Sequence, residues 1–238
     1  MSNSNVGGAR ARAKSLLLSW ARPLALALAG SLAACAVGDT DGATASVGDA
    51  AQPVQLFAGV EQHGSALGDP AAPLTLVELS DLRCYHCKDF ATMTLPVLID
   101  RYVRTGRLRI VSESLPILGP DSVAAARMAV AAGLQDRFFQ FTEVFFTHSG
   151  GPVDDALLRR LGSLVPGLDV DVAMNARDSA AVTDALVDAR RTAQEFAVQG
   201  VPAFLLGKTG AQPTYLQGVR PGVAATLTER IDQALGAL

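Results

Sequence analysis

The chain has 238 residues, of which 49% are hydrophobic and 18% charged, and its formal net charge is −3. This apolar content excludes a disordered chain, and the length suits one well-cored domain or one domain with a sizeable insertion. Residues 1–34 carry four basic side chains and no acidic one, so the rest of the chain has a formal charge of about −7. That charge argues against nucleic acid as a partner, because such binding depends on neutralising phosphates.

Residues 1–34 are predicted to be a secretory signal peptide, since a basic start leads into an apolar segment that ends in small residues. The uninterrupted apolar run Pro23–Ala34 is shorter than the roughly 20 residues that span a membrane. The last residues, "LAAC", resemble the bacterial lipobox, in which the cysteine is lipidated and becomes the first residue of the mature chain. The resemblance implies lipidation of Cys35; the alternative is ordinary signal cleavage that leaves Cys35 as a free thiol.

Residues 35–52 are small, polar and weakly acidic, which predicts a flexible tether, and the folded part is expected to start at Pro53. The apolar run Leu74–Ser80 predicts a buried strand. A helical pattern follows from Cys84 to Gly106 and contains Pro96, which should kink it. Residues 108–114 predict a second strand.

The next segment is predicted to be helical. One helix covers residues 122–133 with Asp121 as a candidate cap, and a second covers residues 136–147 with five phenylalanines. We assign these rings to core packing rather than to a ligand groove. Two amphipathic helices follow, at residues 154–164 and 179–197, then strands at 201–207 and 214–219 and a closing helix at 223–235.

This order of elements predicts an α/β fold whose sheet is interrupted by a helical insertion. We place the sheet domain at residues 53–115 and 192–238 and the insertion at residues 116–191.

Cys84 and Cys87 are separated by Tyr85 and His86 at the expected start of the first long helix. A structural zinc site needs four ligands, whereas this chain has one cysteine pair and three scattered histidines, so we expect no metal. A structural disulfide across two residues closes too short a loop to constrain the unfolded chain much. At a helix N-terminus, however, the amide groups and the helix dipole stabilise the thiolate of Cys84, the form that attacks disulfides. His86 could assist through a hydrogen bond or its charge.

The chain resembles the DsbA-like thiol:disulfide oxidoreductases of the thioredoxin superfamily over most of residues 73–235. The resemblance implies a thioredoxin-like fold with a helical insertion domain. It is carried by the order and spacing of five blocks: "LVELSDLRCYHC", "TLPVLIDRYVRTGRLRIV", "LPILGPDSVAAA", "QGVPAFLL" and "LQGVRP".

The resemblance also implies the roles of individual residues. Cys84 corresponds to the exposed nucleophile and Cys87 to the buried resolving cysteine. Pro202 corresponds to a cis-proline beside the active site, where the backbone of Val201 pairs with an extended substrate. Glu78 stands where the family often carries a buried acid that exchanges protons with the resolving cysteine; the alternative is a glutamate that faces solvent at a sheet edge. Arg109 is a candidate partner for Glu78.

One residue departs from the family pattern. The family usually has proline after the first cysteine, and this chain has Tyr85, which we group with Val201 and Pro202 as substrate-binding. His86 is typical of strongly oxidising members, whereas Tyr85 leaves the strength of oxidation open.

The sequence therefore predicts a lipid-anchored enzyme on the periplasmic side of the bacterial cell envelope. Its partners would be exported proteins with thiols or disulfides and a membrane redox protein, and its only redox group would be the Cys84–Cys87 disulfide, with no other cofactor. The alternatives are a disulfide reductase or isomerase of the same fold, and a non-catalytic peptide-binding lipoprotein.

Overall fold

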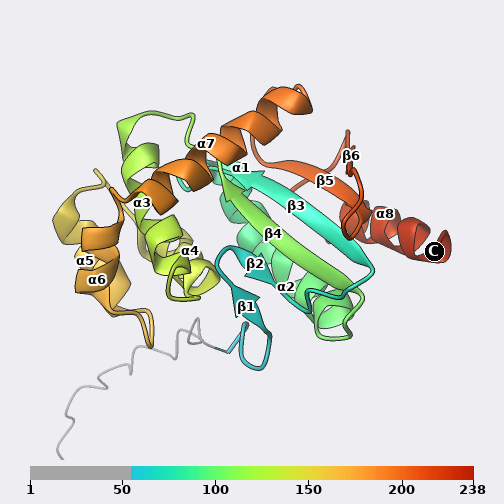
Figure 1. Cartoon of the computed structure of the whole chain (residues 1–238), viewed down its shortest axis with the longest axis horizontal. Helices are drawn as coiled ribbons and strands as arrows, with labels where there is room; N and C mark the ends of the chain where they lie inside the picture. Colours follow the sequence, from blue (N-terminus) through green and yellow to red (C-terminus); the bar gives the residue numbers. More distant parts are fainter. Residues whose placement is uncertain (1–54) are drawn as a thin grey trace, which may run out of the picture. The chain divides into compact units, whose positions relative to one another are not determined.

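A six-stranded mixed sheet lies at the centre of the computed structural model, which describes residues 55–238 (Figure 1). The predicted signal peptide, Cys35 and the tether lie outside the described residues. The strand order is β1-β2-β4-β3-β5-β6, with β3 parallel to β4 and every other pair antiparallel. The bounds are β1 Gln62–His63, β2 Ala66–Leu67, β3 Leu74–Ser80, β4 Leu108–Ser114, β5 Ala203–Lys208 and β6 Thr214–Tyr215.

The three long strands confirm the predicted strands at residues 74–80, 108–114 and 201–207, and β6 lies within the predicted strand at 214–219. The short strands β1 and β2 were not predicted. Alternate residues of β3 point to opposite faces of the sheet. Leu74 and Leu76 pack into the larger core, whereas Leu79 packs into a smaller core on the other face with Ala193 and Leu205.

A long helical segment begins at Tyr85, directly after Cys84, and covers the face with the larger core. It consists of α1 (Tyr85–Asp89), the π-helical turn η1 (Phe90–Thr94), α2 (Leu95–Leu98) and a second π-helical turn, η2 (Ile99–Val103). Pro96 has no N–H and lies at the start of α2, and the Leu95 N–H donates to the carbonyl of Phe90, five residues earlier. The two π-helical turns therefore flank the proline, where helices adapt to a missing hydrogen bond.

Between β4 and β5 the chain forms five helices: α3 (Pro120–Gly133), α4 (Phe138–His148), α5 (Asp155–Ser163), α6 (Val170–Ala176) and α7 (Ala180–Glu195). The helix α6 was not predicted. The predicted cap of α3 was wrong, because Gly119 is the N-cap with a φ of 111° and Asp121 lies in the first turn. Helices α3 to α6 gather at one end of the sheet, and α7 packs against β4 (Figure 1).

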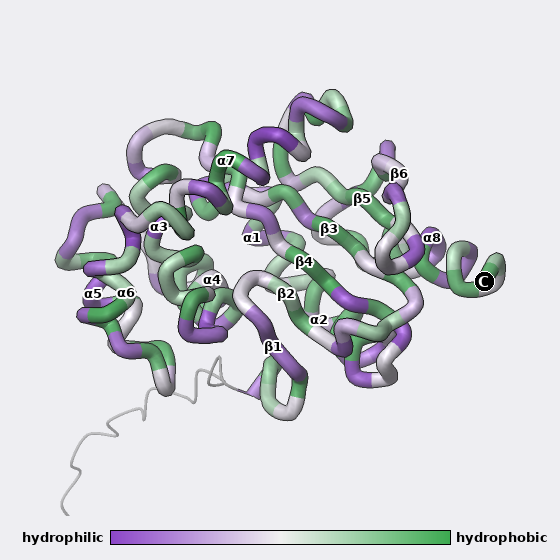
Figure 2. Tube along the Cα trace, in the orientation of Figure 1, coloured by the Kyte–Doolittle hydropathy of each residue, from purple (hydrophilic) through white to green (hydrophobic). Residues whose placement is uncertain are grey.

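The closing helix α8 (Ala224–Gly236) packs against α2 on the face with the larger core. Figure 2 shows hydrophobic residues along the central strands, whereas much of α7 is hydrophilic. All five phenylalanines of α4 are buried, which confirms their place in the core. None of the helices between residues 55 and 238 is long and apolar enough to cross a membrane. The observed architecture confirms the predicted α/β class.

Candidate active site

The two cysteines lie where the carboxyl end of β3 turns into α1. Cys84 is the N-cap residue of α1 and is half-buried, whereas Cys87 lies in the first turn and is fully buried. Both are free thiols in this structure. The Cys84 sulfur is therefore the more accessible of the two, and the Cys87 sulfur is buried behind it.

The Val201-Pro202 segment lies against Cys84. The peptide bond between these residues is cis. The Cys84 thiol donates a hydrogen bond to the carbonyl oxygen of Val201, with a distance of 3.4 Å between sulfur and oxygen. The structure thus brings together residues that lie 117 positions apart in the chain.

The environments of the two thiols shift their pKa values in opposite directions. A hydrogen bond from the Cys87 side chain, helped by the backbone N–H groups of Cys87 and His86, lowers the pKa of Cys84 to about 6, although partial burial opposes this. Burial raises the pKa of Cys87, and the neighbouring Cys84 and Glu78 raise it further. At neutral pH the thiolate is therefore Cys84, and Cys87 holds the proton.

Glu78 lies beneath the pair on β3 and is only 5% exposed, so it does not face solvent at an edge. The Ser112 hydroxyl donates to its carboxylate at 3.1 Å. Burial raises the pKa of Glu78 to about 7, while hydrogen bonds from Ser80 and Ser112 oppose the shift. Arg109, the candidate partner, pairs in register with Thr75 rather than with Glu78, and Ser112 is the residue opposite Glu78. The predicted pairing with Arg109 was therefore wrong.

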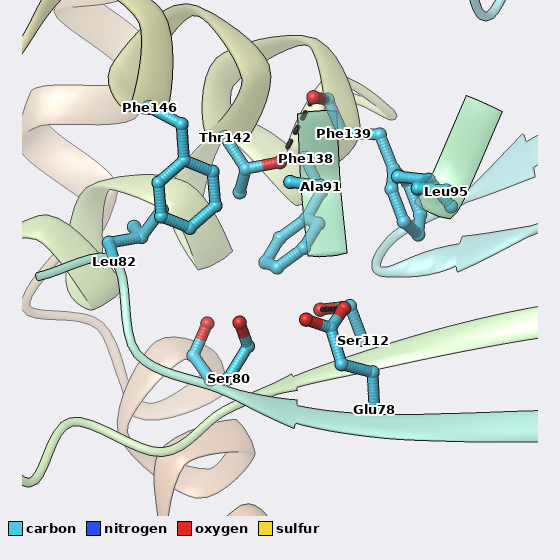
Figure 3. Close-up of a pocket in the computed structure, with 11 residues that line it drawn as sticks. Glu78, Ser80, Leu82, Ala91, Leu95, Ser112, Phe138, Phe139, Thr142 and Phe146 are labelled. Carbon is cyan, nitrogen blue, oxygen red and sulfur yellow. Dashed lines mark hydrogen bonds between the residues drawn. The ribbon is translucent and has the colours of Figure 1, made fainter. Parts of the chain in front are cut away.

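A cavity of about 20 Å³ lies beside Glu78, which is room for about one water molecule. Figure 3 shows Glu78, Ser80 and Ser112 on the strands facing aromatic rings of α4 across this space. Its polar walls also include Ser114 and Thr142. The carboxyl group therefore has polar neighbours inside an otherwise apolar core.

The side chains of Tyr85 and His86 point outward. Tyr85 is 70% exposed, and its ring meets the His86 ring edge-on at 5.5 Å between centroids. The His86 imidazole lies 3.3 Å from the carboxylate of Asp89 and is largely exposed. It is the backbone N–H of His86 that acts on the Cys84 sulfur. Tyr85 therefore exposes its aromatic ring next to Cys84 in the chain.

Asp81 belongs to the site and was not predicted. It is 2% exposed and its backbone N–H donates to the Cys87 sulfur at 3.4 Å. A single aspartate after a strand belongs to no recognisable motif. The sequence offers one hint, because Asp81 directly follows the predicted strand and precedes Cys84 by three residues. Within residues 55–238, no group of three or more histidine, cysteine or acidic side chains is arranged to hold a metal ion.

Comparisons with known proteins bear on this site. A family model described as Thioredoxin matches residues 61–217. A protein of Bacillus cereus named "Probable disulfide bond formation protein D" is 26% identical over 168 residues, which are 68% of this chain and 77% of the relative.

Two solved structures resemble the fold. Oxidised BdbD from Bacillus subtilis has a TM-score of 0.62 at 18% identity and covers 74% of this chain and 97% of its own. Alpha-DsbA1 of Wolbachia pipientis has a TM-score of 0.61 at 23% identity, with coverages of 73% and 91%. At these identities the structural likeness speaks for the fold, while the family match covers most of the chain, including both cysteines and the Val201-Pro202 segment. The chain therefore belongs to the thioredoxin family and, within it, resembles the DsbA-like oxidoreductases.

Proposed function

We propose that this chain is a thiol:disulfide oxidoreductase that forms disulfides in exported proteins, with Cys84 as the nucleophile and Cys87 as the resolving cysteine. The observation that carries the proposal is the pair of unequal thiols at the start of α1, with Cys84 hydrogen-bonded to Val201 and Cys87 buried behind it. The name of the Bacillus cereus relative, a probable disulfide bond formation protein, supports the same activity.

In the oxidising direction the enzyme starts with a Cys84–Cys87 disulfide. A substrate thiolate attacks the Cys84 sulfur, the bond between the cysteines breaks, and Cys87 leaves with the electron pair. Because burial disfavours a thiolate at Cys87, that sulfur takes up a proton, and Glu78 is the nearby acid that can supply it. A water molecule in the adjoining cavity could relay the proton.

The second substrate thiolate then attacks the substrate sulfur of the mixed disulfide. The bond to Cys84 breaks, and Cys84 leaves as a thiolate, which its lowered pKa makes a good leaving group. The substrate has lost two electrons and gained a disulfide, and the enzyme is left reduced, with Cys87 as a thiol and Cys84 as a thiolate. Of the two protons that the substrate thiols release, one restores Glu78 and the other passes to solvent. A membrane redox partner would reoxidise it.

Substrate would lie along Val201, whose carbonyl is beside the nucleophile, in contact with Pro202 and with the exposed ring of Tyr85. An extended substrate segment can pair with such a free stretch of backbone regardless of its side chains, which suits an enzyme with many substrates. We further propose export through the signal peptide of residues 1–34 and lipid anchoring through Cys35 on the periplasmic side of the envelope, which the sequence of that segment supports.

One observation favours a reductase of the same fold as a second candidate. The pKa of Cys84, about 6, lies nearer the value of about 7 known for thioredoxin than the value of about 3.5 known for DsbA. A less acidic nucleophile stabilises the dithiol form less, so the couple would be a weaker oxidant.

Replacing the nucleophile tests the activity directly. Cys84→Ser should abolish disulfide exchange in an insulin reduction assay, because a hydroxyl cannot form the mixed disulfide. Cys87→Ser should instead trap mixed disulfides with substrate, since the resolving thiol is missing. Exchange at the wild-type rate in Cys84→Ser would exclude the proposed mechanism.

A further inference from the structure

Asp81 contacts both cysteines of the redox turn, which is the segment of residues 82–87 that follows β3. Its backbone N–H donates to the Cys87 sulfur at 3.4 Å, and its carbonyl accepts from the Cys84 N–H at 3.0 Å. The main chain of one residue thus holds both cysteines. These contacts fix where the two sulfurs lie relative to the end of β3.

The buried carboxylate of Asp81 binds two separate loops. One oxygen accepts from the Arg83 N–H at 2.8 Å, which closes the turn before Cys84. The other accepts from the N–H groups of Ile117 and Leu118 at 2.8 and 3.0 Å. All three donors are backbone amides, so the carboxylate ties the redox turn to the loop between β4 and α3.

The loop that Asp81 holds presents apolar side chains to solvent. Ile117 is 49% exposed and Leu118 is 53% exposed. A buried carboxylate is costly unless hydrogen bonds compensate it, and three N–H donors provide that compensation. The bond from the Arg83 amide alone would be enough to close the turn before Cys84. The two further bonds, from Ile117 and Leu118, therefore indicate that the carboxylate has a second role, which is to hold the loop after β4.

The charge of Asp81 also acts on the nucleophile. The negative carboxylate raises the pKa of Cys84, against the stronger lowering by Cys87 and the helix amides. The other ionisable groups around the pair are Glu78 beneath it, Arg83, which lies 3.9 Å from Asp121, and His86, Lys88 and Asp89 on α1.

We propose that Asp81 is a positioning residue of the redox site: it joins the redox turn to the Ile117–Leu118 loop, and its charge holds the oxidising strength of the Cys84–Cys87 couple below what the helix N-terminus alone would give. The role of the couple as an exchanging disulfide rests on the proposed function. Asp81 touches neither substrate nor a reacting bond and acts through the placement and charge around Cys84.

The substitution Asp81→Asn tests the charge. We expect a lower pKa of the Cys84 thiol, measured by the ultraviolet absorbance of the thiolate against pH. We also expect a shift of the glutathione equilibrium towards the reduced protein by about two- to tenfold, which corresponds to about 0.3–1 pKa unit. Asp121→Asn is the matched control, because Asp121 is a nearby acid that faces solvent and is not among the groups acting on Cys84. A folded Asp81→Asn variant with the pKa and equilibrium of the control would overturn the proposal.

Hydrogen exchange in the wild-type chain tests the positioning without a variant. The Ile117 and Leu118 amides should exchange slowly although their side chains are exposed, because both are bonded to a buried carboxylate. Exchange as fast as at the amides of the exposed Gly150 and Gly151 would overturn the proposal even if Asp81→Asn does not fold. Neither this measurement nor the thiolate titration requires activity, so an inactive wild-type protein would count against the proposed function alone.

Discussion

At the scale of single residues, the site separates two identical thiols by their surroundings. Cys84 occupies the N-cap position of α1, where the backbone N–H groups of His86 and Cys87 lower its pKa, and its thiol contacts the Val201 carbonyl. Cys87 is enclosed by apolar side chains. Glu78 lies on the same side of the sheet and shares this burial, which keeps its carboxyl protonated into the neutral range. An acid with a pKa near working pH can both give and take a proton.

The burial of Glu78 should make stability depend on pH. The pKa of Glu78 is raised from 4.5 to about 7 in the folded protein. As the pH rises through this range, the unfolded chain loses the proton first, so folding becomes less favourable by up to about 3 kcal/mol above pH 7. Glutamine does not titrate, so the free energy of unfolding of Glu78→Gln lacks this decrease. The free energy of unfolding of the variant minus that of wild type should therefore increase from pH 4.5 to pH 8. Urea unfolding of the reduced proteins at several pH values measures the difference, and an advantage that does not vary with pH would contradict it.

The same variant should slow disulfide exchange by about tenfold or more, because Cys87 loses its proton donor. Glu143→Gln is the control for this effect. Burial also raises the pKa of Glu143 to about 7, but Glu143 lies on α4 and does not act on either thiol. Its substitution should alter the pH dependence of stability and leave exchange unchanged.

At the scale of helices and strands, α4 covers the part of the core next to the site. Phe138, Phe139 and Phe146 line the cavity beside Glu78, while Phe141 and Phe145 are fully buried with ring centroids 6.2 Å apart. The five rings therefore build the core, and three of them also form the apolar surroundings of the carboxyl group.

Removing one of the deeper rings should weaken the fold without altering the chemistry. Phe141→Ala is expected to lower the free energy of unfolding by about 3–5 kcal/mol, because a large cavity remains in a packed core. Val172→Ala, on the exposed face of α6, should change it by less than about 0.5 kcal/mol. Denaturant unfolding measures both. An equally small effect at Phe141 would show that the α4 rings are not core residues.

The sequence predicted the elements that have a clear period or composition. The apolar run of β3, the long helices and the apolar run of β5 next to a Gly/Pro turn carry such signals. The two-residue strands β1 and β2 and the seven-residue helix α6 are too short to show a period. The cap of α3 was misassigned because Gly119, with its positive φ, replaces the side-chain cap that Asp121 would have provided.

The site was predictable only in part, for a related reason. Cys84 and Cys87 are recognisable from their spacing, whereas the contacts of Asp81 with Ile117 and Leu118 arise from two loops that meet only in the folded chain. The partner of Glu78 was missed because it depends on register: Ser112, not Arg109, lies opposite on β4. Sequence order alone does not fix which residues of neighbouring strands face each other.

At the scale of the whole molecule, the fold brings three distant segments to one end of the sheet. The carboxyl end of β3 leads into the redox turn, the neighbouring end of β4 leads into the Ile117–Leu118 loop, and the segment before β5 supplies Val201 and Pro202. The segment between β4 and β5 is helical, and α4 from this segment encloses Glu78. We therefore expect the fold to set the acidity of Cys84, and with it the direction of electron flow.

The reduction potential of the Cys84–Cys87 couple, measured against glutathione at pH 7, tests this most directly. A nucleophile with a pKa of about 6 should give a potential between about −250 and −200 mV, which lies above the value of about −270 mV for thioredoxin and below the value of about −120 mV for DsbA. Such a couple can oxidise substrate thiols. A potential at or below about −270 mV would contradict the oxidase and favour the reductase, and one below about −300 mV would indicate a structural disulfide.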